Sequence, residues 1–97
     1  MSEWIRTVNQ LKRELPTDMP VKVRIVDSLP GGHRALCERK KDHYLIRIEK
    51  AVPLEWRYWL LAHEWGHLLD DWQVATEDHG ASFGYWYSKA WNVIFNE

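Results

Sequence analysis

The sequence predicts an α+β domain with the order helix, three strands, two helices (α-β-β-β-α-α) and a small antiparallel or mixed sheet. Three observations predict this class. Apolar residues recur at helical spacing near both ends of the chain, and segments between residues 21 and 49 alternate apolar and polar side chains. The length of 97 residues is sufficient for one hydrophobic core. We therefore expect residues 1–97 to form a single domain.

The first half of the chain is expected to hold one helix and the three strands. Apolar residues at Trp4, Ile5, Val8, Leu11 and Leu15 predict a helix over 2–15 with one buried stripe. Strands are predicted at Val21–Val26, at Arg34–Glu38 and at Tyr44–Glu49, of which the second alternates poorly. Leu29–Gly32 is expected to turn, and Arg39–Asp42 to form a charged hairpin tip.

The second half is expected to hold two helices. Pro53 suits a first helical turn, and the helix it opens runs to about Asp70. One face of this helix carries Leu54, Tyr58, Leu61, Trp65, Leu68 and Trp72, and the other Trp56, Leu60, His63, His67 and Asp70. Such a helix should pack on the sheet and also line a cleft. After a polar connection at 73–78, the spacing of Phe83, Tyr87, Ala90, Trp91 and Ile94 predicts a closing helix.

Composition and charge exclude several classes of protein. The single Cys37 rules out an internal disulfide framework, which favours a reducing, cytoplasmic location. The charged residues of the first helix are unlike a signal peptide, and no apolar run has membrane-spanning length. A net charge of -1 gives no field that would hold the chain on nucleic acid. We expect a protein or peptide substrate, no membrane, and no nucleic acid unless a partner brings it; the oligomeric state stays open.

The segment His63-Glu64-Trp65-Gly66-His67 carries the chemistry. Two histidines four residues apart on a helix place both imidazoles on one face, where they can bind one metal ion. Glu64 lies at the edge of that face, where a carboxylate can reach a water on the metal as general base. Gly66 is small enough for a following element to approach closely. This spacing predicts a catalytic Zn²⁺ site.

A catalytic zinc usually has three protein ligands and a water, so one ligand is missing from the helix. His79 is the expected third, because the preceding connection is long enough to reverse direction and a helix follows. Glu77 and Asp78 are rival oxygen ligands, or an acidic first turn that favours the helix dipole.

Two stretches, Leu61–His67 and Asp78–Phe83, together resemble the SprT and WLM type of zincin, whose signature is HExxH and a later His-Gly-x-x-Phe. The resemblance covers 53–94 and implies a zincin-like fold in which a sheet-edge strand lies along the cleft. It also implies zinc on His63, His67 and His79, with Glu64 as catalytic base. The segment is similar to ImmA/IrrE-type peptidases too, although their third ligand is Glu. The chain ends at Glu97 without the second zinc module or DNA-binding extension of full-length SprT-like proteins.

The function expected from this site is hydrolysis of peptide bonds by a zinc-bound water that Glu64 activates. Tyr85, Tyr87, His33 and His43 are unranked candidates for stabilising the oxyanion, each with an ordinary structural role as the alternative. The strand Tyr44–Glu49 could pair with an extended peptide, or be an ordinary sheet strand.

Other residues have plainer interpretations. Asp70 could orient an imidazole, but is more often solvated near a helix end. Cys37 is expected to be a buried small hydrophobe, and Arg39-Lys40-Lys41 a solvated hairpin. The alternative functions are a catalytically silent zincin-like module that binds a protein partner through a fold stapled by zinc, and a small nucleic-acid-associated factor using the basic hairpin.

Overall fold

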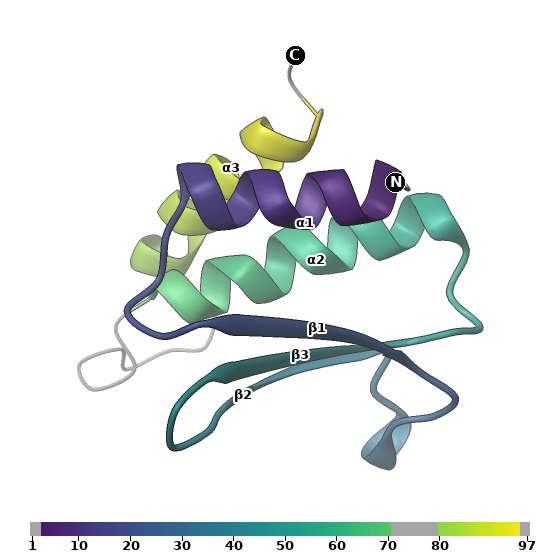
Figure 1. Ribbon diagram of the computed structural model, residues 1–97. Helices are drawn as coiled ribbons and strands as arrows, with labels where there is room; N and C mark the ends of the chain where they lie inside the picture. The colour runs from purple at the N-terminus through teal and green to yellow at the C-terminus, as the bar shows by residue number, and fades with distance from the viewer. Residues whose placement is uncertain (1–2, 71–79, 96–97) are drawn as a thin grey trace.

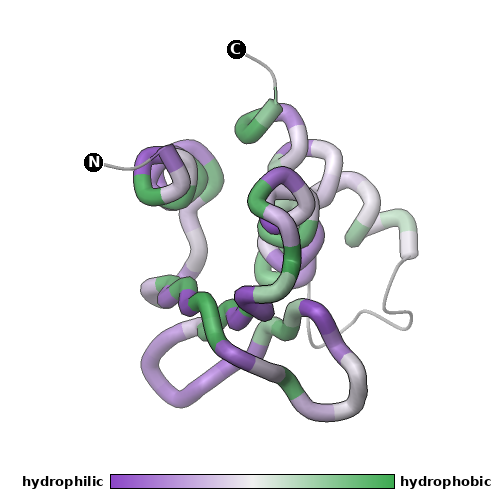
Figure 2. The backbone as a smooth tube through the Cα atoms, turned by 90° about the vertical axis from the view of Figure 1, so that its right-hand side faces the viewer, coloured by the Kyte–Doolittle hydropathy of each residue, from purple (hydrophilic) through white to green (hydrophobic). Residues whose placement is uncertain are grey.

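Three helices cover one face of a three-stranded sheet in a computed structural model that describes residues 3–70 and 80–95 (Figure 1). The elements are α1 (Glu3–Glu14), β1 (Val21–Val26), β2 (Ala35–Arg39), β3 (Tyr44–Glu49), α2 (Leu54–Leu69) and α3 (Ala81–Phe95). Turned by 90°, the molecule shows the helices side by side above the sheet (Figure 2). The α+β class is confirmed, and the elements lie within one or two residues of their predicted bounds wherever those fall in the described ranges.

The sheet is mixed, with strand order β1-β3-β2. Its central strand, β3, runs parallel to β1 and antiparallel to β2. A short 3₁₀ turn at Pro30–Gly32 lies in the connection from β1 to β2, and Gly31 and Gly32 adopt φ angles of 66° and 73° that side chains disfavour. This long connection leaves room for one strand between β1 and β2. The chain turns back after β2 in a tight hairpin, and β3 occupies that central position.

The inner face of the sheet forms the floor of the core. In β3, the buried side chains of Tyr44, Ile46 and Ile48 alternate with partly exposed side chains on the opposite face. The register places Cys37 of β2 and Val23 of β1 on either side of Ile46, so all three point to the same face. The helices cover this face (Figure 1).

Helix α2 packs on the sheet, with α1 on one side and α3 on the other (Figure 2). Its predicted apolar face is confirmed at Leu61, Trp65 and Leu68, which are buried. The Nε1–H of Trp65 donates to the carbonyl oxygen of Leu15 at 3.1 Å, which ties α2 to the end of α1. The prediction is wrong for Leu54, whose side chain is 55% exposed because the first turn of α2 extends beyond the packed layer.

No helix within the described ranges 3–70 and 80–95 combines the length and the hydropathy needed to cross a bilayer. The longest, α2, has 16 residues and carries two histidines and a glutamate in its second half.

The ends of α2 match the sequence pattern. Pro53 precedes its first residue, and Asp70, directly after its last residue, donates its backbone N–H to the Gly66 carbonyl.

Candidate metal centre

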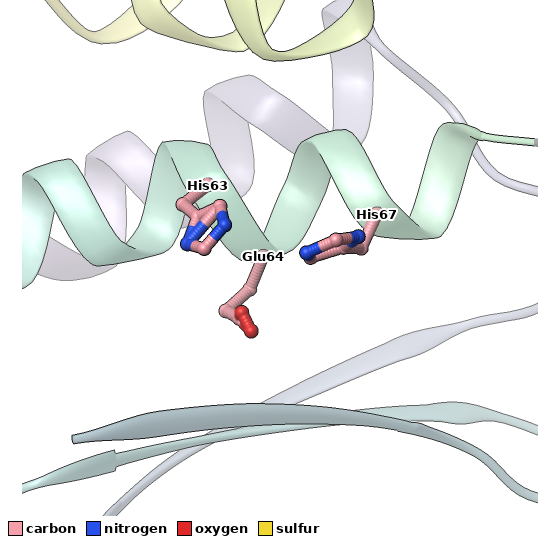
Figure 3. A group of neighbouring side chains, drawn as sticks. All are labelled: His63, Glu64 and His67. Atoms are coloured by element: carbon pink, nitrogen blue, oxygen red, sulfur yellow. The ribbon is translucent and has the colours of Figure 1, made fainter. Parts of the chain in front are cut away.

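The side chains of His63, Glu64 and His67 converge on one side of α2. Their potential ligand atoms all lie within 4.8 Å of one another, and the centroids of the two imidazole rings are 4.9 Å apart. Figure 3 shows the imidazoles one turn apart along the helix, with the Glu64 carboxylate pointing down toward the sheet. The spacing of four residues produces this arrangement because one helical turn brings the two side chains to the same face.

Glu64 is a buried carboxylate without a partner. Its side chain is about 5% exposed, and its Oε2 atom has no hydrogen-bond partner among the described residues. Burial raises the pKa of this carboxyl group from 4.5 to about 7, because the charged form is poorly solvated there. An unsatisfied buried acid usually marks a bound ion, a water or a catalytic role.

The three residues fit a divalent transition metal. Two imidazole nitrogens are suitable ligands for such an ion, and a nearby carboxylate outside the coordination shell can accept a proton from water. The group could therefore hold a metal ion. The predicted third ligand His79, its rivals Glu77 and Asp78, and the predicted stripe residue Trp72 lie outside the described residues.

Phe83 of α3 packs against both imidazoles. Its ring centroid lies 4.4 Å from that of His67 and 5.2 Å from that of His63, and its side chain is buried. An apolar ring in this position restricts the rotamers of the two histidines. Sequence reasoning placed Phe83 in the closing helix and in the resemblance motif, but it missed this contact. The sequence signal that could have indicated this contact was the position of Phe83 four residues after the expected ligand His79.

Gly66 is the point where α3 crosses α2. A Cβ atom built at Gly66 would lie 3.0 Å from the backbone N and Cα of Tyr87, and 3.1 Å from a ring carbon of Phe83. The sequence predicted that a small residue here would admit a following element, and the structure confirms this close approach. The glycine thus brings α3, and with it Phe83, onto the face of α2 that carries the histidines.

Strand β2 is an edge of the sheet and packs against α2. The pKa of the Cys37 thiol is raised to about 12, first by burial and second by the negative charge of Glu64. The prediction that Cys37 fills the core as a small side chain agrees with its partly buried position against the hydrophobic cluster.

Of the two roles that the sequence left open for Tyr44–Glu49, the structure supports the ordinary sheet strand and not the pairing with a peptide. This segment is β3, which is paired along its length with β1 on one side and β2 on the other. A strand with both neighbours in place has no free backbone N–H or C=O groups to offer. Within the described residues, an open pairing edge belongs instead to β1 and to β2.

Of the four oxyanion candidates, Tyr87 lies nearest the histidines, with its ring centroid 5.9 Å from that of His63. Tyr85 is exposed under Lys89, and His33 is exposed after the 3₁₀ turn. His43 pairs with Asp42 at 2.8 Å in the β2–β3 hairpin. The structure therefore brings one of the four candidates to the metal-binding face.

The remaining predicted residues have structural positions. Asp70 is buried at the end of α2, against the expectation of a solvated side chain. In the basic hairpin, Lys40 pairs with Glu38 at 2.9 Å and Arg39 approaches Asp18 at 3.9 Å. These pairs fit a solvated hairpin, as expected.

An apolar pocket of about 670 Å³ opens next to His63. Trp56, Trp59 and Leu60 of α2 form one wall, and Phe83 and Tyr87 of α3 form another. Its volume falls in the range of sites that bind small molecules or side chains. His63 lines the pocket together with Trp56 and Leu60, three of the residues on the helix face that the sequence predicted to line a cleft.

Comparisons of the chain with models of protein families, with curated proteins and with solved structures return no match.

Proposed function

We propose that this protein is a zinc-dependent metallopeptidase. One observation carries the proposal: a buried, unpartnered carboxylate, Glu64, lies beside two imidazoles held one helical turn apart. A site that only bound zinc for stability would gain nothing from a desolvated acid at this position. The resemblance to HExxH zincins, carried by His63–His67 and by the His-Gly-x-x-Phe stretch at 79–83, supports the same function.

Each side chain has a distinct role in the proposed reaction. His63 and His67 would hold the ion through imidazole nitrogens, and His79 would supply the third protein ligand. When bound, zinc supplies Lewis-acid polarisation of a peptide carbonyl and lowers the pKa of a water. Glu64 would take up a proton on its carboxylate and later pass it to the nitrogen of the leaving amine.

The substrate is a peptide in extended conformation, and β2 is the element that would bind it. This strand is an edge of the sheet and packs against α2. A peptide can add to such an edge through backbone hydrogen bonds, as in many complexes between sheets and extended segments. Its scissile carbonyl would then lie between β2 and the histidines of α2.

The decisive test is metal content, measured by elemental analysis of protein purified without added metal. We expect one zinc per chain in the wild type and in Glu64→Gln, and clear loss in His63→Ala, His67→Ala and His79→Ala. The matched control is His33→Ala, which removes an exposed histidine outside the cluster. A folded wild type that takes up no zinc when zinc is supplied would refute the proposal.

Hydrolysis is then tested with the zinc-loaded protein and an unfolded protein substrate, with new peptide termini detected by mass spectrometry. Glu64→Gln should retain zinc and lose hydrolysis by at least a hundredfold, because the proton acceptor is gone. Equal hydrolysis by wild type and Glu64→Gln would identify a contaminating peptidase and contradict the assigned base. Zinc that raises thermal stability in both proteins, with no hydrolysis by either, would instead identify a zinc-stapled binding module.

A further inference from the structure

We infer that the outer face of the sheet, on the side away from the helices, binds an acidic segment of another protein. Two observations carry this inference: cations of neighbouring strands lie side by side on this face, and its carboxylates are already paired with other groups. The inference is independent of the proposed peptidase function, because the candidate metal centre lies on α2, on the opposite side of the sheet (Figure 1).

The outer face consists of the strand side chains that alternate with those of the core. Its members are Lys22, Arg24 and Val26 of β1, Leu36 and Glu38 of β2, and Leu45, Arg47 and Glu49 of β3. The connection between β1 and β2 reaches the Glu49 end of this face, where the backbone N–H of Leu29 donates to the Glu49 carboxylate at 2.8 Å. Lys22 and Arg24 are exposed, so the β1 side of the face is open to a partner.

Two arginines lie directly opposite one another on this face. The register pairs Arg24 of β1 with Arg47 of β3, and like charges in such a position repel. Arg47 donates to the Glu38 carboxylate, yet its Nε–H is buried without a hydrogen-bond partner among the described residues. Arg24 donates to the carbonyl of Val23 at 3.2 Å and forms no ion pair with a carboxylate of the described residues. An anion placed between the two guanidinium groups would relieve their repulsion.

The carboxylates of the outer face are engaged elsewhere. Glu38 pairs with Arg47 and also with Lys40, at 2.9 Å from the latter. Glu49 lies 3.8 Å from Arg34 at the end of the face. Each carboxylate therefore already has a cation of its own, and neither balances the charge of Arg24.

Lys22 extends the unbalanced charge along β1. It lies two residues before Arg24, on the same face, and forms no ion pair within the described residues. The carboxylate of Asp42, in the neighbouring hairpin, pairs with His43 at 2.8 Å. The β1 side of the face thus presents an excess of positive charge, which carboxylates complement well because a guanidinium group can bind one through two parallel hydrogen bonds.

The same face disfavours nucleic acid. Within the three strands, all of which the structure describes, no aromatic side chain lies on the outer face, so bases would have no ring to stack on. Glu38 and Glu49 lie among the cations and would repel a continuous run of phosphates. The net charge of -1 gives no long-range field toward a polyanion. A peptide can instead place separate carboxylates at Arg24 and Lys22, with apolar side chains on the two leucines of the face.

The first experiment compares two labelled peptides of about ten residues by fluorescence anisotropy with the wild-type protein. One peptide carries about four Glu residues, and the other has Gln in their place. At low ionic strength we expect the Glu peptide to bind roughly tenfold tighter, with the advantage lost at about 0.5 M salt, where exposed charges are screened. Equal binding of the two peptides at low salt would overturn the inference.

Variants locate the binding on the sheet. Arg24→Gln should weaken binding of the Glu peptide roughly fivefold. Arg13→Gln is the matched control, because it removes the same charge from an exposed position on α1, on the other side of the sheet. Both positions are exposed, so the fold should persist, which circular dichroism verifies. An equal loss of affinity in the two variants would show an effect of net charge alone and would overturn the assignment to this face.

The last comparison separates this surface from the metal centre and from nucleic acid. The metal-free and zinc-loaded proteins should bind the Glu peptide equally well, whether or not the protein hydrolyses peptides. Binding that requires zinc would place the peptide at the metal centre and overturn the inference. A mixed-sequence DNA duplex of about 20 base pairs should not displace the peptide. Displacement by the duplex that is lost in Arg24→Gln would identify a phosphate-binding face and would also overturn it.

Discussion

Gly66 of α2 lies directly against the backbone of Tyr87 in α3, so close that a Cβ atom would come within 3.0 Å of the Tyr87 N and Cα atoms. Backbone atoms in the middle of a helix cannot move aside as the end of a flexible side chain can. This contact fixes the separation of the two helices on the face that carries His63 and His67. It explains why a helix-disfavouring glycine stands between the two candidate ligands.

Gly66→Ala should therefore destabilise the fold. The clash is expected to cost about 2–3 kcal/mol, partly offset by the roughly 1 kcal/mol that alanine contributes to a helix, for a net loss of about 1–2 kcal/mol. The control is Gly84→Ala in α3, where a Cβ atom meets nothing within 4 Å and stability should rise by up to about 1 kcal/mol. Urea unfolding of both variants measures the difference. Equal stabilisation by the two substitutions would show that α3 does not approach Gly66 as described.

Phe83→Leu should weaken zinc binding roughly tenfold, comparable to the loss of other groups that orient metal ligands. The shorter side chain keeps the core apolar but no longer presses a flat ring against both imidazoles. Competition with a chelator of known affinity measures the change. Phe95→Leu, in the last turn of α3, serves as control and should bind zinc as the wild type does. An unchanged affinity in Phe83→Leu would mean that the ring has no part in positioning the histidines.

The stability of the metal-free protein should fall as pH rises from about 4.5 to 7. The pKa of Glu64 is about 7 in the folded protein and near 4.5 when exposed, so folding favours the protonated carboxyl. Its contribution to stability is fully present below pH 4.5 and is lost by about pH 7, on the order of 3 kcal/mol in total.

The measurement is urea unfolding in the presence of a chelator across this range, for wild type and Glu64→Gln. The difference between the two proteins isolates Glu64 from other titrating groups. The pKa of Glu38 is lowered from 4.5, so the titration of this group changes stability only below about pH 4.5, outside the window measured. Glu64→Gln should be the more stable protein at pH 8. Parallel pH profiles for the two proteins would contradict the burial of an unpaired carboxylate.

Cys37 should resist alkylation at neutral pH. With its pKa raised to about 12 from 9.0, the thiolate fraction at pH 8 is about a thousandfold lower than in the unfolded chain. Iodoacetamide should therefore label the native protein at least a thousandfold more slowly than the urea-unfolded protein. Glu64→Gln should label faster than wild type, because the carboxylate charge is the second cause of the shift. Native labelling at the unfolded rate would place the thiol in solvent rather than beside Glu64.

The predictions from sequence succeeded where the signal is local. The bounds of β1 and β3 follow from alternation within six residues, and the limits of α2 follow from Pro53 and the change to polar residues near Asp70. The convergence of His63, Glu64 and His67 follows from helical geometry alone, since residues four apart share a face whatever surrounds them. These features depend on neighbours in the chain, so the sequence by itself determined them.

Tertiary structure alone decided the pairing of the strands and the surroundings of the site. Nothing in the pattern of β3 indicates that it inserts between β1 and β2, because alternation reports which face is buried and not which strand is adjacent. The contact of Phe83 with both imidazoles and the pocket beside Trp59 arise from α3 folding back on α2. Such contacts join residues far apart in the chain, and their geometry depends on how whole elements pack rather than on any local spacing.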